Sequence, residues 1–114
     1  MDRRIEFVIS LLENDTSRAW DTHTLATLVN LSTSRFRHLF KQETGTSPRQ
    51  YLRELRLRKA EVLLATTFLS IKEIAEAVGL APLNHFMRRF KKRHGVTPGA
   101  YRIAARLGSS KTKH

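Results

Sequence analysis

The chain has 114 residues, of which 40% are hydrophobic and 27% are charged, and it contains no cysteine. This length suits one domain, or two very small domains that share an element. The absence of cysteine excludes disulfides, thiolate zinc sites and cysteine nucleophiles. The apolar stretch from Phe7 to Leu12 is too short to span a membrane and lacks the form of a signal peptide, so we expect a soluble, cytoplasmic protein.

Positive charge is concentrated in the C-terminal part of the chain. Lysine and arginine number 21 against 10 acidic residues, which gives a formal net charge of +11. Residues 1–47 contain six basic and six acidic residues, whereas residues 48–114 contain fifteen basic and four acidic ones. Such a one-sided positive field attracts polyanions. A solubilising surface would have a similar composition, so charge alone leaves nucleic-acid binding undecided.

The strongest signal is an internal repeat. From Phe36 onward the sequence matches itself fifty residues later, and further upstream the offset is 49. The matched pairs are Phe36 and Phe86, Phe40 and Phe90, Lys41 and Lys91, Gly45 and Gly95, Pro48 and Pro98, Tyr51 and Tyr101, Leu25 and Ile74, Ala26 and Ala75, Val29 and Val78, and Leu31 and Leu80. Ten matches in the same order exceed what chance produces, so the chain contains two copies of one structural unit.

Residues 3–13 are predicted to form a short amphipathic helix, the first element in chain order. Its apolar face consists of Ile5, Val8, Ile9 and Leu12. The next helix begins after Asp21, a residue type favoured at the N-cap, and ends near Asn30, which suits a left-handed position. A third helix over about 33–44 begins after Ser32 and ends at a glycine. Two short helices joined by a tight turn predict a helix-turn-helix motif.

A longer helix over residues 48–66 follows and links the two copies. Its apolar residues at helical spacing are Tyr51, Leu52, Leu55, Ala60, Leu63 and Leu64. In the second copy Ser70 and Glu73 form a capping box, and a glycine ends the helix that they start. The second helix of this copy, over about 82–94, has Pro82 in its first turn. The second copy therefore predicts another helix-turn-helix motif.

The last predicted elements are a helix over residues 98–107 and a basic tail over residues 108–114, which we expect to be disordered. The total is seven helices and no strand. The fold class is therefore predicted as all-α, with helix-turn-helix subdomains over residues 1–47 and 67–107 joined by the linker helix.

The outward faces of the two second helices carry residue types that read DNA. Because Phe36 and Phe86 point inward, the opposite side of each helix is left to polar residues. These outward side chains are Ser34, Arg37, His38, Lys41 and Gln42 in the first copy, and Asn84, His85, Met87, Arg88, Lys91 and Lys92 in the second. Arginine can bond guanine, asparagine can pair with adenine and lysine can neutralise phosphate. A solvated face has similar residues, but their place in a helix-turn-helix motif in both copies favours DNA readout.

These motifs resemble the DNA-binding domain of the AraC/XylS family of bacterial transcription regulators. The resemblance covers about residues 3–106 and is densest in IKEIAEAVGLAPLNHFMRRFKKRHGVTPGAYR. It rests there on Gly79, Leu80, Phe86, Phe90, Lys91, Gly95, Thr97, Pro98, Tyr101 and Arg102, and in the first copy on Leu39, Phe40, Lys41, Gly45, Ser47, Pro48 and Tyr51.

The resemblance implies a sequence-specific transcription regulator that activates transcription and inserts one recognition helix of each copy into double-stranded DNA. It implies base contacts by Ser34, Arg37, His38, Leu83, Asn84, His85 and Arg88. Phosphate contacts are expected from Arg35, Lys41, Lys91 and Lys92. The resemblance also implies contact with RNA polymerase, and we expect no cofactor and no metal.

Three positions depart from the pattern of the family. Ala81 stands where the family commonly has a serine cap. Leu83 cannot hydrogen-bond a base edge, so we expect it at most to touch a thymine methyl group. Arg89 occupies the place at which Leu39 packs in the first copy, so its stem can cover the core while its guanidinium reaches solvent or phosphate.

Members of the family usually join this domain to a separate ligand-sensing or dimerisation domain, while a few stand alone. The chain is therefore either a stand-alone regulator or a piece of a longer protein, and by itself we expect it to be a monomer.

The length of the linker helix suits binding in two grooves. A helix of about 19 residues spans roughly 28 Å, which is close to the distance of about 34 Å between successive major-groove faces of DNA. One chain would then occupy adjacent grooves of an asymmetric site.

An enzyme is the weaker alternative function. The five histidines lie at positions 23, 38, 85, 94 and 114, and no pair has the spacing of a metal or catalytic motif. His94, beside Gly95, is interpreted as a cation at a helix end.

A non-specific nucleoid- or RNA-binding protein is the stronger alternative, because the basic run from Arg88 to Arg93 would bind any polyanion. Sequence preference separates this alternative from a regulator.

Overall fold

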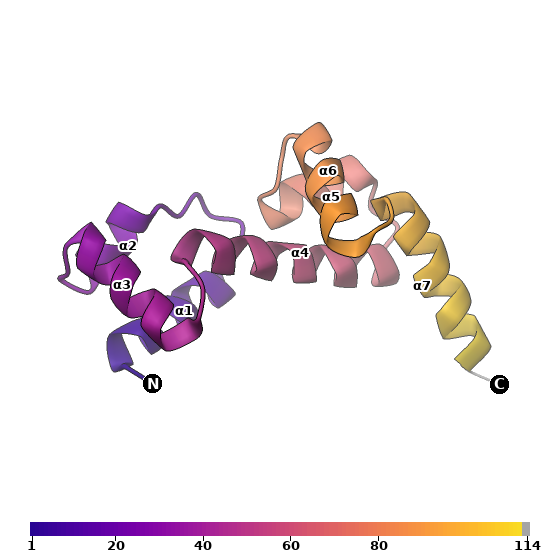
Figure 1. Ribbon diagram of the computed structural model, residues 1–114. Helices are drawn as coiled ribbons and strands as arrows, with labels where there is room; N and C mark the ends of the chain where they lie inside the picture. The colour runs from indigo at the N-terminus through magenta and orange to yellow at the C-terminus, as the bar shows by residue number, and fades with distance from the viewer. Residues whose placement is uncertain (113–114) are drawn as a thin grey trace. The chain divides into compact units, whose positions relative to one another are not determined.

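The structure, a computed structural model, describes residues 1–112, with the side chains of residues 1–108. Within that part of the chain seven α-helices form and no strand does, which confirms the all-α prediction (Figure 1). The helices are α1 (Arg3–Asn14), α2 (Thr22–Leu28), α3 (Thr33–Thr44), α4 (Pro48–Thr66), α5 (Ile71–Val78), α6 (Leu83–His94) and α7 (Pro98–Thr112). None of these helices in the described part combines the length and the apolar character that crossing a membrane requires.

The first compact unit, Met1–Leu55, is built around one hydrophobic core. Helices α1, α2, α3 and the start of α4 supply its buried side chains, which are Ile5, Val8, Leu12, Leu25, Ala26, Phe36, Phe40, Leu52 and Leu55. Phe40 lies at its centre, with ring centroids 5.8 Å from Phe36 and 5.4 Å from Tyr51. The predicted inward face of the third helix is therefore confirmed.

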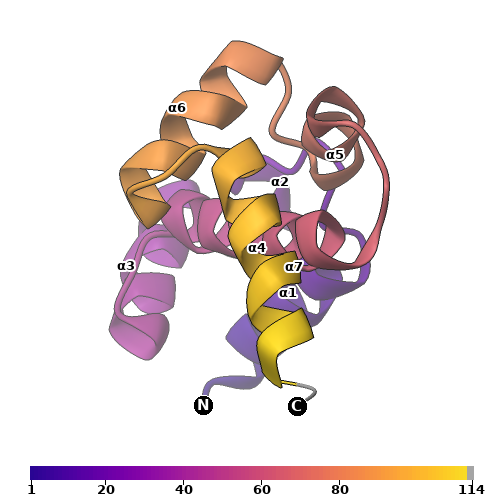
Figure 2. The same ribbon diagram turned by 90° about the vertical axis from the view of Figure 1, so that its right-hand side faces the viewer.

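The second compact unit, Arg56–His114, repeats this arrangement with the second copy of the sequence. Its core consists of Leu57, Ala60, Leu64, Ile74, Ala75, Val78, Leu80, Phe86 and Phe90. Phe90 contacts Phe86 at 5.8 Å and Tyr101 at 5.3 Å between ring centroids. Figure 2 shows α6 and α5 on the two sides of α7. Four pairs of residues that match in sequence thus take matching buried places in the two cores: Leu25 and Ile74, Ala26 and Ala75, Phe36 and Phe86, and Phe40 and Phe90.

Helix α4 contributes side chains to both cores. Leu52 and Leu55 belong to the first core, while Ala60 and Leu64 belong to the second. The first unit therefore extends past residue 47, where the sequence places the start of a separate linker. Leu57, which the helical spacing did not assign to the apolar face, is also buried in the second core.

The helix ends follow the predicted capping chemistry. Ser70 and Glu73 form a capping box in which each side chain accepts a hydrogen bond from the backbone N–H of the other residue, at 3.0 and 2.9 Å. The Asp21 side chain accepts from the backbone N–H of Thr24 at 2.8 Å. Asn30 has a φ of 60° and Gly79 a φ of 81°, so both adopt the left-handed conformation expected after the first helix of each motif.

Two predictions about helix ends are wrong. Pro82 is the N-cap of α6 and not a residue of its first turn, and its carbonyl oxygen accepts from the backbone N–H of His85 and of Phe86, each at 3.1 Å. The tail predicted to be disordered continues α7 as far as Thr112, while residues 113–114 lie outside the described residues. No proline interrupts this segment, and extending a packed helix requires fixing only one residue for each hydrogen bond gained.

Candidate nucleic-acid interface

Helix α3 separates a buried side from a polar, exposed side. Phe36 and Phe40 are fully buried, and the half-buried Leu39 packs beside them. The predicted contact residues on this helix are all exposed: Ser34, Arg35, Arg37, His38 and Lys41. Ser34, His38 and Lys41 follow one another at spacings of four and three, so they share the side of the helix opposite the core. The first unit therefore presents three cationic residues, one histidine and one hydroxyl on one helix.

Helix α6 presents the corresponding side of the second unit with different residues. Its exposed predicted contacts are Asn84, His85, Arg88, Lys91 and Lys92. Leu83 differs from them, because it is half-buried and packs against the second core. It precedes the buried Phe86 by three residues and so lies on the same side of the helix. Arg89, at the place of Leu39, is also half-buried, as expected for a stem that covers the core.

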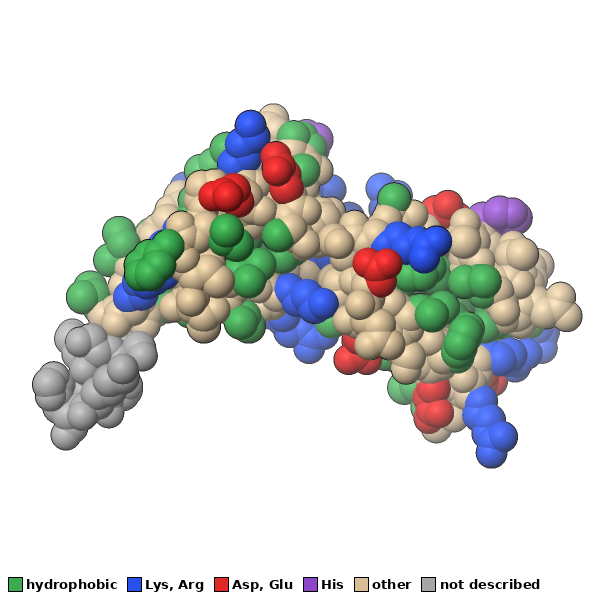
Figure 3. Space-filling model, turned by 180° about the vertical axis from the view of Figure 1, so that it is seen from behind, with side chains coloured by type: hydrophobic (Ala, Val, Ile, Leu, Met, Phe, Trp, Pro, Cys, Tyr) green, Lys and Arg blue, Asp and Glu red, His purple; other side chains and the backbone are tan. Residues whose placement is uncertain are grey.

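The charge of α6 increases toward its C-terminal end. The last turn contains Lys91, Lys92, Arg93 and His94, and it ends at Gly95 with a φ of 78°. Cations at a helix C-terminus interact favourably with the partial negative charge of the unpaired carbonyl groups. On the side of the molecule seen in Figure 3, acidic, basic and hydrophobic side chains are interspersed, so that side is not uniformly basic.

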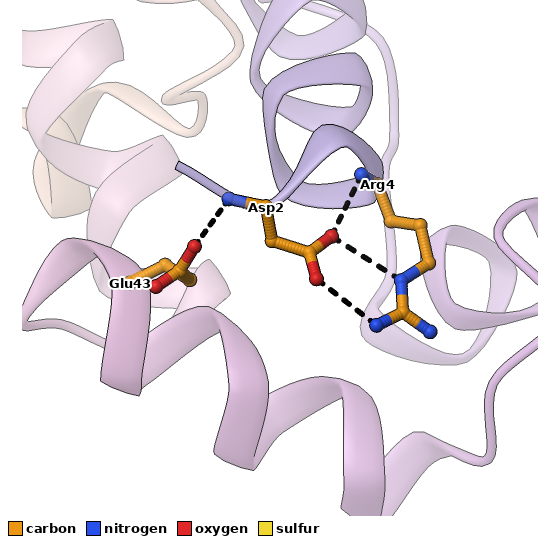
Figure 4. Close-up of polar contacts among 3 residues, drawn as sticks. All are labelled: Asp2, Arg4 and Glu43. Atoms are coloured by element: carbon orange, nitrogen blue, oxygen red, sulfur yellow. Dashed lines mark hydrogen bonds and ion pairs between the residues drawn. The ribbon is translucent and has the colours of Figure 1, made fainter.

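The C-terminal turn of α3 is tied to the first helix of its unit. The Glu43 carboxylate accepts a hydrogen bond from the backbone N–H of Asp2, and the Asp2 carboxylate caps α1 and pairs with Arg4 at 3.0 Å (Figure 4). Hydrogen bonding to the Arg4 side chain lowers the pKa of Asp2 from its usual 3.8 to about 2. At the other end of α3, Thr33 Oγ1 lies 3.2 Å from His23 Nδ1 on α2. These contacts hold the exposed side of α3 in place.

The C-terminal turn of α6 and helix α7 are each held against α4 by contacts that the sequence did not predict. His94 Nε2 lies 2.5 Å from Glu61 Oε1 on α4, and its Nδ1 lies 3.2 Å from the Phe90 carbonyl oxygen. The Arg102 side chain on α7 donates to the Leu64 carbonyl oxygen at 3.0 Å, which ties α7 to the end of α4. His94 does lie at a helix end as predicted, but only 11% of its side chain is exposed. No local sequence pattern could signal these pairs, because their members are more than thirty residues apart.

A metal centre finds no support in the described residues. No group of three or more histidine, aspartate or glutamate side chains there could hold a metal ion. Two exposed carboxylates act as helix caps instead. Backbone and hydroxyl hydrogen bonds from Thr24 lower the pKa of Asp21, and backbone and hydroxyl hydrogen bonds from Ser70 lower that of Glu73.

Comparison with protein families identifies one match that covers most of the chain. Residues 25–104 match a family model described as a helix-turn-helix domain. This range runs from the first motif through the linker helix and the second motif to α7, so both copies of the repeat lie within the match.

Curated relatives are longer regulators. The chain is 31% identical over 101 residues to the HTH-type transcriptional regulator MtrA of Neisseria gonorrhoeae, which covers 89% of this chain and 34% of MtrA. It is 34% identical over 103 residues to the RCS-specific HTH-type transcriptional activator RclR of Escherichia coli, which covers 90% of this chain and 36% of RclR. The chain therefore spans about a third of the length of these relatives.

Solved structures share the fold along nearly the whole chain. The DNA-binding domain of the global transcriptional factor AdpA, solved in complex with a target DNA, matches with a TM-score of 0.88 and 28% identity over 93% of this chain and 96% of that domain. A transcriptional regulator from Chromobacterium violaceum, described as an AraC-type DNA-binding domain-containing protein, matches with a TM-score of 0.82 and 32% identity over 90% and 91% of the two chains.

Proposed function

The chain belongs to the helix-turn-helix family of AraC-type regulators, and from this premise we propose that it is a sequence-specific, double-stranded DNA-binding transcription regulator. The observation that carries the proposal is that two helices with matching buried sides expose different polar sides. A purely structural repeat has no need of two distinct sets of hydrogen-bonding groups at the exposed positions. AdpA, whose DNA-binding domain has this fold, was solved on a target DNA, which supports the same use here.

Base reading is assigned to the exposed residues nearest the start and middle of α3 and α6. They are Ser34, Arg37 and His38 on α3, and Asn84, His85 and Arg88 on α6. Arg88 and Arg37 suit the acceptor edge of guanine, and Asn84 suits adenine. Leu83 reaches DNA only with the part of its side chain that does not pack on the core, which suits a thymine methyl group. Different residues on the two helices imply an asymmetric site.

Phosphate binding is assigned to cations that flank these residues. They are Arg35 and Lys41 on α3, and Lys91 and Lys92 on α6. All four side chains are exposed, so they can reach a backbone without breaking an internal contact of the core. Such contacts position the protein on the duplex and carry no sequence information.

We further infer that the chain acts in the bacterial cytoplasm on nucleoid DNA, without enzymatic activity. Activation through contact with RNA polymerase is favoured, because relatives such as RclR are activators. The isolated chain is expected to be a monomer whose two recognition helices occupy successive major grooves. In a longer protein, a ligand-sensing or dimerisation domain would add to this activity.

Selection of bound duplexes from a random pool tests the proposal. A regulator should enrich one asymmetric motif and bind it roughly a thousandfold or more tightly than unrelated DNA at the same salt concentration. A non-specific nucleoid- or RNA-binding protein would enrich no motif and would bind duplexes and RNA with similar, strongly salt-dependent affinity. Enrichment of an inverted repeat occupied by two chains would contradict the asymmetric, single-chain mode of binding.

A further inference from the structure

The ring of His94 is fixed at the end of α6 by aromatic packing. It stacks on the buried Phe90 with 3.9 Å between ring centroids and an angle of 16° between ring planes. The Tyr101 ring of α7 lies edge-on to it at 5.3 Å. Because two aromatic rings set its orientation, the directions of its two nitrogen atoms are also set.

Both nitrogen atoms of His94 point at hydrogen-bond acceptors. Nε2 lies 2.5 Å from the Glu61 carboxylate and Nδ1 lies 3.2 Å from the Phe90 carbonyl oxygen. A neutral imidazole carries one N–H, whereas the imidazolium carries two. Only the imidazolium can donate to both acceptors at once. Loss of one proton must therefore break the hydrogen bond to α4 or the one within α6.

The charged and titratable groups around His94 come from three helices. Glu61 on α4 places its carboxylate against Nε2, and Tyr101 on α7 is an aromatic neighbour of the ring. On α6 itself the cations Lys91, Lys92 and Arg93 precede it in the last turn. The carboxylate is the one group of opposite charge that these contacts place against the ring.

The first unit lacks this ion pair although its scaffold is the same. The buried Ile5, Val8 and Leu12 of α1 have the spacing of Leu57, Ala60 and Leu64 of α4, which puts the apolar Ile9 at the place of Glu61. The place of His94 is taken by Thr44, whose hydroxyl donates to the Phe40 carbonyl oxygen at 2.8 Å. The repeat therefore folds without a Glu–His pair, and the pair adds something particular to α6.

We propose that Glu61 and His94 are positioning residues for DNA binding: when His94 carries both protons, the pair locks the C-terminal turn of α6 and holds Lys91 and Lys92 where they reach phosphate. This inference rests on the proposed role of α6 as a recognition helix. Neutral His94 loses one of its two hydrogen bonds, so the turn loosens and the phosphate contacts weaken.

The test compares the wild-type chain with Glu61→Gln at pH 6 and pH 8, at constant ionic strength, on the duplex recovered from the random pool. The glutamine amide can accept from the imidazolium or donate to a neutral ring nitrogen, so it keeps the link in either state. The wild-type affinity should fall about three- to tenfold more than that of Glu61→Gln between the two pH values. The other histidines are the same in both proteins, so their contribution cancels in this comparison.

A matched control separates positioning from a simple change of net charge. Glu76→Gln removes one negative charge from an exposed position of α5 in the same unit, and its pH profile should equal that of the wild type. The slope of log affinity against log salt should also flatten at pH 8 for the wild type and not for Glu61→Gln, because fewer phosphates are neutralised. Thermal melts at both pH values confirm that each protein is folded during the assay.

Two outcomes overturn the inference. One is the same pH dependence and salt slope in the wild type and Glu61→Gln, and the other is a Glu76→Gln profile as flat as that of Glu61→Gln. If the wild-type chain still prefers its selected duplex over other sequences, either outcome leaves the proposed function standing. A wild-type chain without any sequence preference would instead overturn the proposed function itself.

Discussion

At the scale of single residues, stability and recognition are divided between two sides of the same helix. Phe86 and Phe90 are buried in the second core, while Asn84 and Arg88 on the same two turns are exposed. A substitution on the exposed side therefore changes what the helix can bind, with little effect on the core. The assigned roles can be tested one side chain at a time.

Arg88 and Lys91 should respond differently to truncation. Arg88→Ala should weaken binding to the preferred site by about 1–3 kcal/mol and relax the preference at one base pair. Lys91→Ala should weaken binding to all sequences alike and reduce the salt slope by about one. Fluorescence anisotropy with the selected duplex and with single-base variants of it measures both effects. A uniform loss of affinity for both proteins would mean that Arg88 does not read a base.

The Asp2 carboxylate should make the first unit sensitive to acid. Its pKa is lowered to about 2 by the hydrogen bond from Arg4, against 3.8 in an ordinary aspartate. Because the folded state has the lower pKa, the stabilisation is present above about pH 4 and is lost as the pH falls toward 2. The melting temperature of Asp2→Asn should therefore fall less over this range than that of the wild type. Equal losses in the two proteins would show that the Asp2–Arg4 pair adds no stability.

At the scale of elements, α6 depends on its aromatic side chains for its position. Phe90 is fully buried and contacts Phe86, His94 and Tyr101, so it joins α6 to α7. Phe90→Ala should reduce the free energy of unfolding by about 3–5 kcal/mol, as seen for large buried aromatic residues. Such a loss would also weaken DNA binding, because the recognition helix would lose its support.

Phe68→Ala is the matched control for that experiment. This side chain is 93% exposed and contacts the Arg106 guanidinium across its ring, at 4.7 Å. Its removal should change the free energy of unfolding by well under about 1 kcal/mol. Urea denaturation of the two variants measures the difference. A comparable loss at both positions would show that Phe90 does not anchor α6.

At the scale of the whole molecule, the proposal requires two half-sites at a fixed separation. Inserting five base pairs between the halves of the selected site turns one half by about half a helical turn. We expect this insertion to remove the contribution of one recognition helix and to lower the affinity at least tenfold. The same five base pairs added outside the site serve as the control. Unchanged affinity after the internal insertion would mean that the two helices do not bind successive grooves together.

The sequence by itself determined the helices, most of their ends and most of their buried sides. The periodicity that places Phe36 and Phe40 inward, the capping box at Ser70 and the left-handed Asn30 all depend on residues within one or two turns. Such local preferences can be read from neighbouring residues, and the repeat supplied a second copy of the buried phenylalanine pair. This is why the ranges of α3 and α4 were predicted as they are observed.

Only the tertiary structure decided which distant residues meet. Glu61 and His94 are 33 residues apart and Asp2 and Glu43 are 41 apart, so both pairs exist only because helices pack against each other. The same packing places part of the Leu83 side chain against the second core, which the position of Leu83 in the sequence does not show. Periodicity assigns a side to each residue of a helix, but the width of the buried side depends on the neighbouring helix that covers it.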